Sequence, residues 1–345
     1  MKKKHFTIKD VAKQAGVAVS TASIALNNKG YVSEVLRKRV QQAVEALDYI
    51  PNRSARSLIN RATGNIGFIV SEEHFSTAEP FYTKVFLGTE FEARQRDYYI
   101  LLTTVPNKFR ASHLPRFILE RNVDGVILAG KISEAYANAV VAEGLPAVVV
   151  DFEFKKVRLP AVNIDNVRGI DIALEHLYEF GHRKIAFVGG DLGHPSIYAR
   201  LQSYNMVQEK LGLDQSDALV SVQEPNTRAE DGYRATLKLL DRNVGITALV
   251  ACNDAVAIGA MRALKERGLN VPEDVSIVGF DDVELCDHVE PRLTSIRVPK
   301  EELGAAALRI LIRAIKEGDH NISTVLVQPT LVPRESTRNL SQQMD

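Results

Sequence analysis

The sequence predicts a small helical domain at the N-terminus, followed by an α/β core of two doubly wound parallel-sheet subdomains. Three observations lead to this fold class. Residues 7–27 carry two short helical patterns around a turn, positive charge is concentrated in residues 1–62, and short aliphatic runs alternate with amphipathic segments from residue 65 onwards. A chain of 345 residues is also long enough for two or three separate cores.

The N-terminal pattern begins at Thr7, whose hydroxyl can accept a hydrogen bond from a free N–H group of the first helical turn. Gly16 ends this helix, because glycine adopts a positive φ without steric cost. A second helix follows Val17. Two helices joined by a tight turn within about 20 residues form a helix-turn-helix pattern, whose second helix enters the major groove of DNA. An ordinary helical hairpin remains the alternative. The expected buried positions are Ile8, Val11, Ala12, Ala15, Ala22, Ala25 and Leu26.

A third helix is expected to begin at Ser33 and to end near Leu47, which closes a small three-helix core. Pro51 then breaks the helical pattern, because the residue before a proline is pushed into extended geometry. Residues 52–60 could form a helix of about nine residues, which is too short to persist alone in water. We therefore expect this linker to become ordered only against a partner.

The charge of the chain is strongly asymmetric. Residues 1–62 contain twelve Lys and Arg against four Asp and Glu, a net charge of +8, so the rest of this formally neutral chain carries −8. A basic segment on an acidic body is expected where a protein neutralises DNA phosphates. A merely solvated charged face would explain the basic residues, but not their coincidence with the helix-turn-helix pattern.

The core is predicted from alternating segments. Strands are expected at residues 66–70, 99–103, 126–128, 147–150, 185–188, 249–251 and 276–278. Helices are expected at residues 82–96, 114–121, 133–143, 168–179, 197–210, 229–240 and 255–267. This alternation favours parallel sheets covered by helices on both faces, and its restart near residues 163–166 indicates two subdomains with a cleft between them. Ligands bind beyond the carboxyl ends of such strands, where the candidates are Ser71, Lys131, Asp151, Asn253 and Asp281.

Several classes of protein are disfavoured by the composition. No stretch approaches the roughly 20 apolar residues of a membrane span. Cys252 and Cys286 have no metal-ligand spacing and suit a reducing cytoplasm, which is the expected location. The eight histidines are scattered, and we find no nucleophile–base set of a hydrolase. No cofactor, metal or catalytic residue is expected, so the protein is not expected to be an enzyme.

Four stretches together resemble the lactose-repressor family of bacterial transcription regulators over about 330 residues. They are TIKDVAKQAGVAVSTAS, YIPNRSARSL, VNIDNVRGIDIALEHLYEFGHRKIAFVGG, and ACNDAVAIGAMRALKERGLNVPEDVSIVGFDD followed by PRLTSI. The resemblance implies a periplasmic-binding-protein-like core, and a homodimer that binds double-stranded, pseudo-palindromic operator DNA under the control of a small-molecule effector. It divides the chain into a DNA-binding domain (residues 1–50), a hinge (51–62) and a core (63–340). Within the core, the N-subdomain comprises about 63–163 and 293–324, and the C-subdomain about 164–292 and 325–340.

The resemblance also implies DNA contacts. Ile24 departs from the family, which commonly has a polar or basic residue there; an isoleucine offers only apolar contact, for example with a thymine methyl. The alternative is that Ile24 belongs to the core. Leu58 matches a leucine that wedges into a base step from the minor groove. The implied DNA-binding residues are Lys9, Val19, Ser20, Thr21, Ser23, Ile24, Asn27, Tyr49, Asn52, Ala55 and Leu58.

An effector pocket, most simply for a sugar or sugar derivative, is implied by the same resemblance. Its residues are Phe81, Lys131, Asp151, Phe152, Ser196, Arg200, Asn253 and Asp281. Two departures are Thr227, where an aromatic residue often stacks on the ligand, and Lys131, where a small polar residue is usual. Together with Arg200, Lys131 suggests a ligand with a carboxylate or phosphate. Asp281 or Asp282 could instead cap a helix. A solute-binding protein or a sugar-processing enzyme with the same core remains the alternative function.

Overall fold

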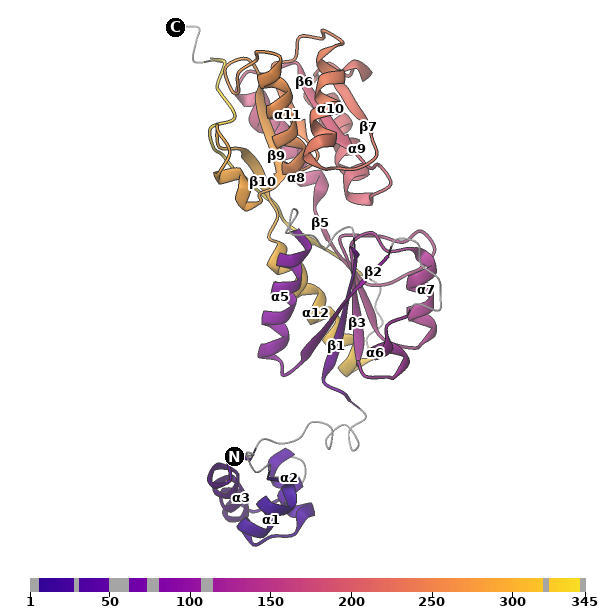
Figure 1. Cartoon of the computed structure of the whole chain (residues 1–345), viewed down its shortest axis with the longest axis vertical. Coiled ribbons are helices and arrows are strands. Elements are labelled where there is room, and N and C mark those ends of the chain that lie inside the picture. Colours follow the sequence, from indigo (N-terminus) through magenta and orange to yellow (C-terminus); the bar gives the residue numbers. More distant parts are fainter. Residues whose placement is uncertain are drawn as a thin grey trace. The chain divides into compact units, whose positions relative to one another are not determined.

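The computed structural model describes residues 6–27, 31–49, 62–72, 81–106, 114–318 and 323–341. The chain divides into two compact units, Met1–Gly64 and Asn65–Asp345, which are described separately (Figure 1). The predicted hinge residues Asn52, Ala55 and Leu58 lie outside the described residues. None of the described helices is long and apolar enough to cross a membrane.

The described part of the N-terminal unit forms the helices α1 (Ile8–Ala15), α2 (Val19–Asn27) and α3 (Glu34–Ala46). They share a core in which Val11, Ala22 and Val40 are almost completely buried. Gly16 ends α1 in the left-handed conformation, with a φ of 63°, as predicted. Thr7 is the N-cap of α1, as predicted, in a capping box with Asp10, whose carboxylate accepts hydrogen bonds from the Thr7 N–H at 2.8 Å and from the Thr7 hydroxyl at 2.7 Å. The helix-turn-helix is confirmed.

The first lobe of the core, here called the N-lobe, is built on a parallel six-stranded sheet with the order β11-β5-β4-β3-β1-β2. Its helices α5 (Phe81–Gln95) and α12 (Lys300–Glu317) lie on one face, and α6 (Arg116–Leu119) and α7 (Glu134–Ala142) on the other (Figure 1). The strands are β1 (Asn65–Ser71), β2 (Tyr99–Val105), β3 (Gly125–Ala129), β4 (Ala147–Val150), β5 (Ala161–Ile164) and β11 (Thr324–Val327). Neighbouring strand residues point to opposite faces, so both helical layers are packed.

Two glycines let α5 and α12 approach closely. A Cβ atom at Gly88 would lie 1.9 Å from the Glu301 carbonyl oxygen, and one at Gly304 would lie 1.9 Å from the Val85 carbonyl oxygen. No larger side chain fits at either position without separating the helices. This close contact holds α5 and α12 together as the helical layer that covers one face of the N-lobe sheet.

The second lobe, here called the C-lobe, contains a six-stranded sheet with the order β12-β10-β9-β8-β6-β7, in which the edge strand β12 is antiparallel to β10. Helices α8 (Asn166–Glu179) and α9 (Pro195–Lys210) pack together, as do α10 (Ala229–Leu240) and α11 (Asp254–Glu266). The strands are β6 (Ile185–Gly190), β7 (Val220–Glu224), β8 (Ala248–Ala251), β9 (Ser276–Asp281), β10 (Thr294–Arg297) and β12 (Thr330–Val332). The predicted fold class, two doubly wound subdomains, is confirmed.

The chain passes between the lobes at three places: between β5 and α8, between β10 and α12, and between β11 and β12. The expected crossings at residues 293 and 325 are wrong by a few residues, because β10 still belongs to the C-lobe sheet and β11 to the N-lobe sheet. The expected helix at residues 114–121 is shorter, and α12 was not predicted as a helix. The short strands β5, β7, β10, β11 and β12 were also not predicted.

Candidate functional site

A cavity of about 510 Å³, open to solvent, lies between the two lobes. It sits where β4, β6, β8 and β9 reach their carboxyl ends, as expected for parallel sheets of this kind. Its lining combines residues of both lobes: Phe81, Tyr82, Asp151, Asp191, His194, Ser196, Ile197, Arg200, Thr227, Asn253 and Asp281. Six of the eight residues predicted for the pocket are therefore brought together.

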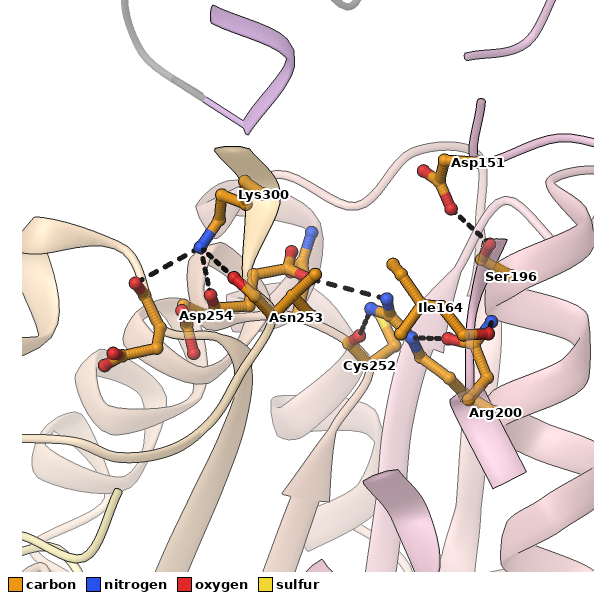
Figure 2. Close-up of polar contacts among 12 residues, drawn as sticks. Asp151, Ile164, Ser196, Arg200, Cys252, Asn253, Asp254 and Lys300 are labelled. Carbon is orange, nitrogen blue, oxygen red and sulfur yellow. Dashed lines mark hydrogen bonds and ion pairs between the residues drawn. The ribbon is translucent and has the colours of Figure 1, made fainter. Parts of the chain in front are cut away.

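Asp151 links the two lobes at this cavity. It follows β4 of the N-lobe and is 5% exposed, and its Oδ2 atom accepts a hydrogen bond from the Tyr82 hydroxyl at 2.7 Å. Its Oδ1 atom accepts a hydrogen bond from the Ser196 hydroxyl at 2.6 Å, and Ser196 lies in the first turn of α9 in the C-lobe (Figure 2). A buried carboxylate with charge-assisted hydrogen bonds on both oxygens is firmly positioned.

The environment changes the protonation of the side chains around Asp151. Burial, together with the neighbouring Asp151 carboxylate, raises the pKa of the Tyr82 phenol well above its usual value. Burial lowers the pKa of His194, although Asp151 opposes that shift from 3.9 Å. At neutral pH, Tyr82 is therefore a hydrogen-bond donor, and His194 adds no positive charge to the cavity.

Arg200 is almost completely buried, at 3% exposure, and each of its nitrogens has an acceptor. Nε donates to the Asn166 amide oxygen at 2.8 Å, and Nη1 donates to the Cys252 carbonyl oxygen at 2.6 Å (Figure 2). Nη2 lies 3.4 Å from Asp281 Oδ1, and the guanidinium stacks on the Phe280 ring at 3.6 Å. These partners hold Arg200 in a fixed orientation at the cavity wall.

Asn253 and Asp281 take different roles at the ends of their strands. Asn253 caps α11, because its Oδ1 atom accepts a hydrogen bond from the Val256 N–H at 2.9 Å, and its Nδ2 atom donates to the Thr227 carbonyl oxygen at 3.0 Å. The Asp281 carboxylate instead faces Arg200. Asp282 accepts hydrogen bonds from two arginine side chains. The alternative that Asp281 or Asp282 caps a helix is therefore wrong.

Two residues predicted for the pocket lie beside the cavity. Lys131, after β3, places Nζ 2.8 Å and 3.0 Å from the carboxylate oxygens of Asp191, which follows β6 in the other lobe. Phe152 lines a neighbouring cavity and meets the His194 ring edge-on, with the ring centroids 5.9 Å apart. The two cations named in the prediction, Lys131 and Arg200, thus both have a carboxylate partner.

Thr227, expected at a ligand-stacking position, also lines the cavity, together with four residues that were not assigned to it from the sequence: Tyr82, Asp191, His194 and Ile197. Asp191 could have been found, because it follows strand β6 directly. Asp151, Asp191 and Asp281 share a further property: all have positive φ, at 55°, 38° and 103°. Non-glycine residues rarely adopt this conformation, and such strain gathers at functional sites. Among the described residues, no group of three or more His, Cys, Asp or Glu side chains could hold a metal ion.

In the N-terminal unit, α2 presents an exposed surface that includes Val19, Ser20 and Ile24. Ile24 is 37% exposed and Val19 is 43% exposed, so Ile24 is not a core residue. Lys9 is exposed on α1, and Thr21 and Ser23 are half-buried. The side chain of Tyr49 is 8% exposed and packs in the core of this unit. Asn27 ends α2.

Comparison with known proteins gives matches in both parts of the chain. Residues 7–52 match the model of bacterial regulatory proteins of the lacI family, and residues 174–337 match a periplasmic binding protein-like domain. The chain is 33% identical over 337 residues to the ribose operon repressor of Haemophilus influenzae, covering 97% of this chain and 99% of that protein.

Solved structures agree with this assignment. The lac repressor dimer bound to operator and the anti-inducer ONPF is 28% identical, with a TM-score of 0.78, over 97% of this chain and 100% of that one. The complex of the transcriptional regulator CelR with cellobiose is 30% identical, with a TM-score of 0.74, over 96% of this chain and 100% of that one. The protein belongs to the lacI family of bacterial regulatory proteins and is a DNA-binding transcription repressor with an effector-binding core, not an enzyme.

Proposed function

We propose that the protein binds a pseudo-palindromic operator as a homodimer, and that a neutral sugar or sugar derivative in the cavity between the lobes switches this binding. The observation that carries the proposal is the position of Asp151, which is bonded to Tyr82 of its own lobe and to Ser196 of the other. A ligand that competes for this carboxylate changes how the lobes are held together. Such coupling is reciprocal: if the ligand weakens operator binding, the operator weakens ligand binding by the same factor.

The chemistry of the cavity supports a polyhydroxy ligand. Its carboxylates accept hydrogen bonds from hydroxyl groups, and the Asn253 amide has a second N–H and a second oxygen lone pair beyond those bonded to Thr227 and Val256. Phe81 supplies an aromatic surface for an apolar ring face. Two relatives point the same way, since one is named for a ribose operon and the other was solved with cellobiose.

The exposed surface of α2 supports the DNA-reading role of this helix. Ser20 and Ser23 offer hydroxyl groups for phosphates or base edges, whereas Val19 and Ile24 offer apolar contact. Lys9, Thr21 and Asn27 are proposed to hold the backbone of the duplex. Asn52, Ala55 and Leu58 are proposed to order in the minor groove when two chains meet on the operator.

Dimerisation is supported by apolar side chains on two adjacent elements of the N-lobe. Leu87 and Phe91 lie four residues apart on α5, at 39% and 50% exposure. Leu102, at 38% exposure, belongs to β2, the last strand at one edge of the N-lobe sheet, and lies on the same face as α5, whereas Tyr99 of this strand, at 61% exposure, lies on the opposite face. An edge strand and a flanking apolar helix face form a ready surface for a second copy of the chain. The operator-bound lac repressor is itself a dimer.

The test has two arms. Selection from random duplexes with the purified protein should return a two-fold related sequence whose affinity falls steeply between 50 and 200 mM salt, by about 10³-fold or more. A thermal-shift screen over neutral sugars, sugar acids, sugar phosphates and nucleobases should give its largest stabilisation with a neutral sugar. No preferred duplex would refute the operator proposal, and the largest stabilisation from a nucleobase would refute the sugar proposal.

A further inference from the structure

An ion pair crosses the cleft beside the cavity. Lys131 stands after β3 of the N-lobe, and its Nζ atom lies within 3.0 Å of both carboxylate oxygens of Asp191, at the end of β6 in the C-lobe. Asp191 lines the cavity, whereas Lys131 lines a small hollow next to it. The carboxylate therefore stands between the lysine ammonium and the ligand space, and both of its oxygens are engaged with that ammonium.

Two further cations at or near the cavity, Arg200 and Lys300, are engaged as well. Each nitrogen of Arg200 has an acceptor, as described above. The Lys300 ammonium donates to the backbone carbonyl oxygens of Asp281, Asp282 and Val298 (Figure 2). Burial keeps the pKa of His194 low, so its ring is neutral. Within the described part of the chain, the lining of the cavity carries three carboxylates, Asp151, Asp191 and Asp281, against the guanidinium of Arg200.

This charge pattern favours neutral ligands. An anion entering the cavity loses its hydration and meets carboxylates without an available cation, and such burial of an unpaired charge is costly. A hydroxyl group, in contrast, can donate a hydrogen bond to a carboxylate. The Lys131 Nζ atom lies 2.8 Å from Asp191 Oδ1, and Asp191 lines the cavity. If the charge on Asp191 were removed, the Lys131 ammonium would therefore remain next to the cavity without a counter-charge.

We propose that Asp191 is a specificity-determining residue that, by neutralising Lys131, prevents anionic ligands such as sugar phosphates and sugar acids from binding in the cavity. This inference rests on the proposed function, in that the cavity is taken to be the effector site. In this proposal, the interlobe pair of Lys131 and Asp191 discriminates between neutral and anionic ligands. Other residues of the cavity accept hydrogen bonds from the hydroxyl groups of the ligand.

The experiment uses the full-length protein and the Asp191→Asn variant. Asparagine keeps the size of the side chain and tolerates the left-handed backbone of this position, where φ is 38°. The probe is inorganic phosphate at constant ionic strength, with chloride as the balancing anion, and the readout is the melting temperature. General stabilisation by phosphate is non-saturable and common to all variants, so only a saturable shift counts as binding.

The expected result is a saturable stabilisation of Asp191→Asn by phosphate that is at least tenfold tighter than any response of the wild type. The double variant Lys131→Met/Asp191→Asn should lose this response, because it lacks the released ammonium. Asp241→Asn is the matched control, since Asp241 pairs with Arg267 at 2.6 Å on the surface and should leave the response unchanged.

Equal saturable binding of phosphate by wild type and Asp191→Asn would overturn the proposal, as would the absence of any gain in Asp191→Asn. Retention of the gain in the double variant would show that another cation is responsible, and would overturn it too. Failure of the proposed function can be told apart from failure of this inference. It would be seen in the wild-type protein without any variant, because no neutral sugar would stabilise it.

Discussion

The Ser196 hydroxyl donates a hydrogen bond to the Asp151 carboxylate at 2.6 Å, and this bond joins the first turn of α9 in the C-lobe to the end of β4 in the N-lobe. Both residues are buried. The same carboxylate accepts a hydrogen bond from Tyr82, so it remains anchored to its own lobe when the lobes separate. Closure of the cleft is therefore connected to a residue that faces the ligand space.

Ser196→Ala should weaken the contact between the lobes in the ligand-free protein and should also weaken binding of the ligand. It removes a hydrogen bond to a buried charge, which is worth about 1.5–3 kcal/mol. We expect a lower melting temperature and at least tenfold weaker binding of the best neutral sugar from the screen. Ser203→Ala is the control, because Ser203 is also buried on α9 but donates within its helix, to the Ala199 carbonyl oxygen at 2.7 Å. Equal behaviour of both variants in ligand binding would contradict the interlobe role.

Arg200→Ala should be among the most destabilising single changes in the core. It leaves Asp281, the Asn166 amide oxygen and the Cys252 carbonyl oxygen without their donor, and removing one partner of a buried ion pair costs about 3–5 kcal/mol. Arg200→Lys should recover part of the loss, since it restores the charge but not the planar fork. The measurement is thermal melting, with Arg267→Ala at an exposed ion pair as the control and an expected loss of at most about 1 kcal/mol. A loss from Arg200→Ala no greater than from the control would refute the structural role.

The N-terminal helices were predictable from the sequence because their signals are local. Gly16 must end α1, and the helical spacing of Val11 and Ala15 fixes its buried face. The strands with continuous aliphatic runs, such as β4, were equally clear because both of their faces are buried. The fold class followed from the alternation of these runs with amphipathic helices.

The elements that were missed lack a strong local pattern or lie at an edge. β11 has three exposed residues out of four, and its place in the sheet depends on pairing with β5, far away in the chain. The position of Asp191 directly after β6 could have marked it as a candidate, but its pairing with Lys131 of the other lobe, 60 residues earlier, is recorded by no local pattern. The α12 helix is different: its buried residues Leu303, Ala307 and Leu311 follow a helical spacing that the sequence did contain.

The buried carboxyl group of Asp254 should make stability depend on pH. Burial raises its pKa from 3.8 to about 7, although Ser295 donates to it at 2.5 Å. Between these values the folded protein holds a proton that the unfolded chain has released, so the free energy of unfolding falls as the pH rises from about 4 to 7. Asp254→Asn lacks this titration. Its free energy of unfolding relative to wild type should rise by up to about 1.4 kcal/mol per pH unit over this interval, and level off above it.

The check for Asp254 is denaturant unfolding of both proteins at a series of pH values. Other titrating groups contribute equally to wild type and variant, so they cancel in the difference. A difference between the two proteins that is constant from pH 4 to 7 would show that Asp254 does not bind a proton there.

Phe91→Glu should impair dimerisation. The side chain is 50% exposed on α5, and a carboxylate there would be buried without a partner if two copies meet on this face. Sedimentation velocity should show a shift to monomer, and operator affinity should fall because each chain brings only one reading domain. Leu285→Glu is the matched control, since Leu285 is also 50% exposed but lies in the C-lobe. A variant Phe91→Glu that remains dimeric would place the interface elsewhere.

Ile24→Ala should reduce specific binding to the selected operator with little effect on binding to random duplex. The side chain is exposed on α2 rather than packed in the core, so its removal leaves the domain intact. An apolar contact with a base contributes to sequence discrimination, whereas non-specific binding depends on phosphate contacts. We expect a loss of about 1 kcal/mol per half-site, measured by competition against random duplex. Val35→Ala, at a 69% exposed position on α3, should change neither affinity. An equal loss for specific and random duplex would mean that Ile24 supports general affinity and does not read bases.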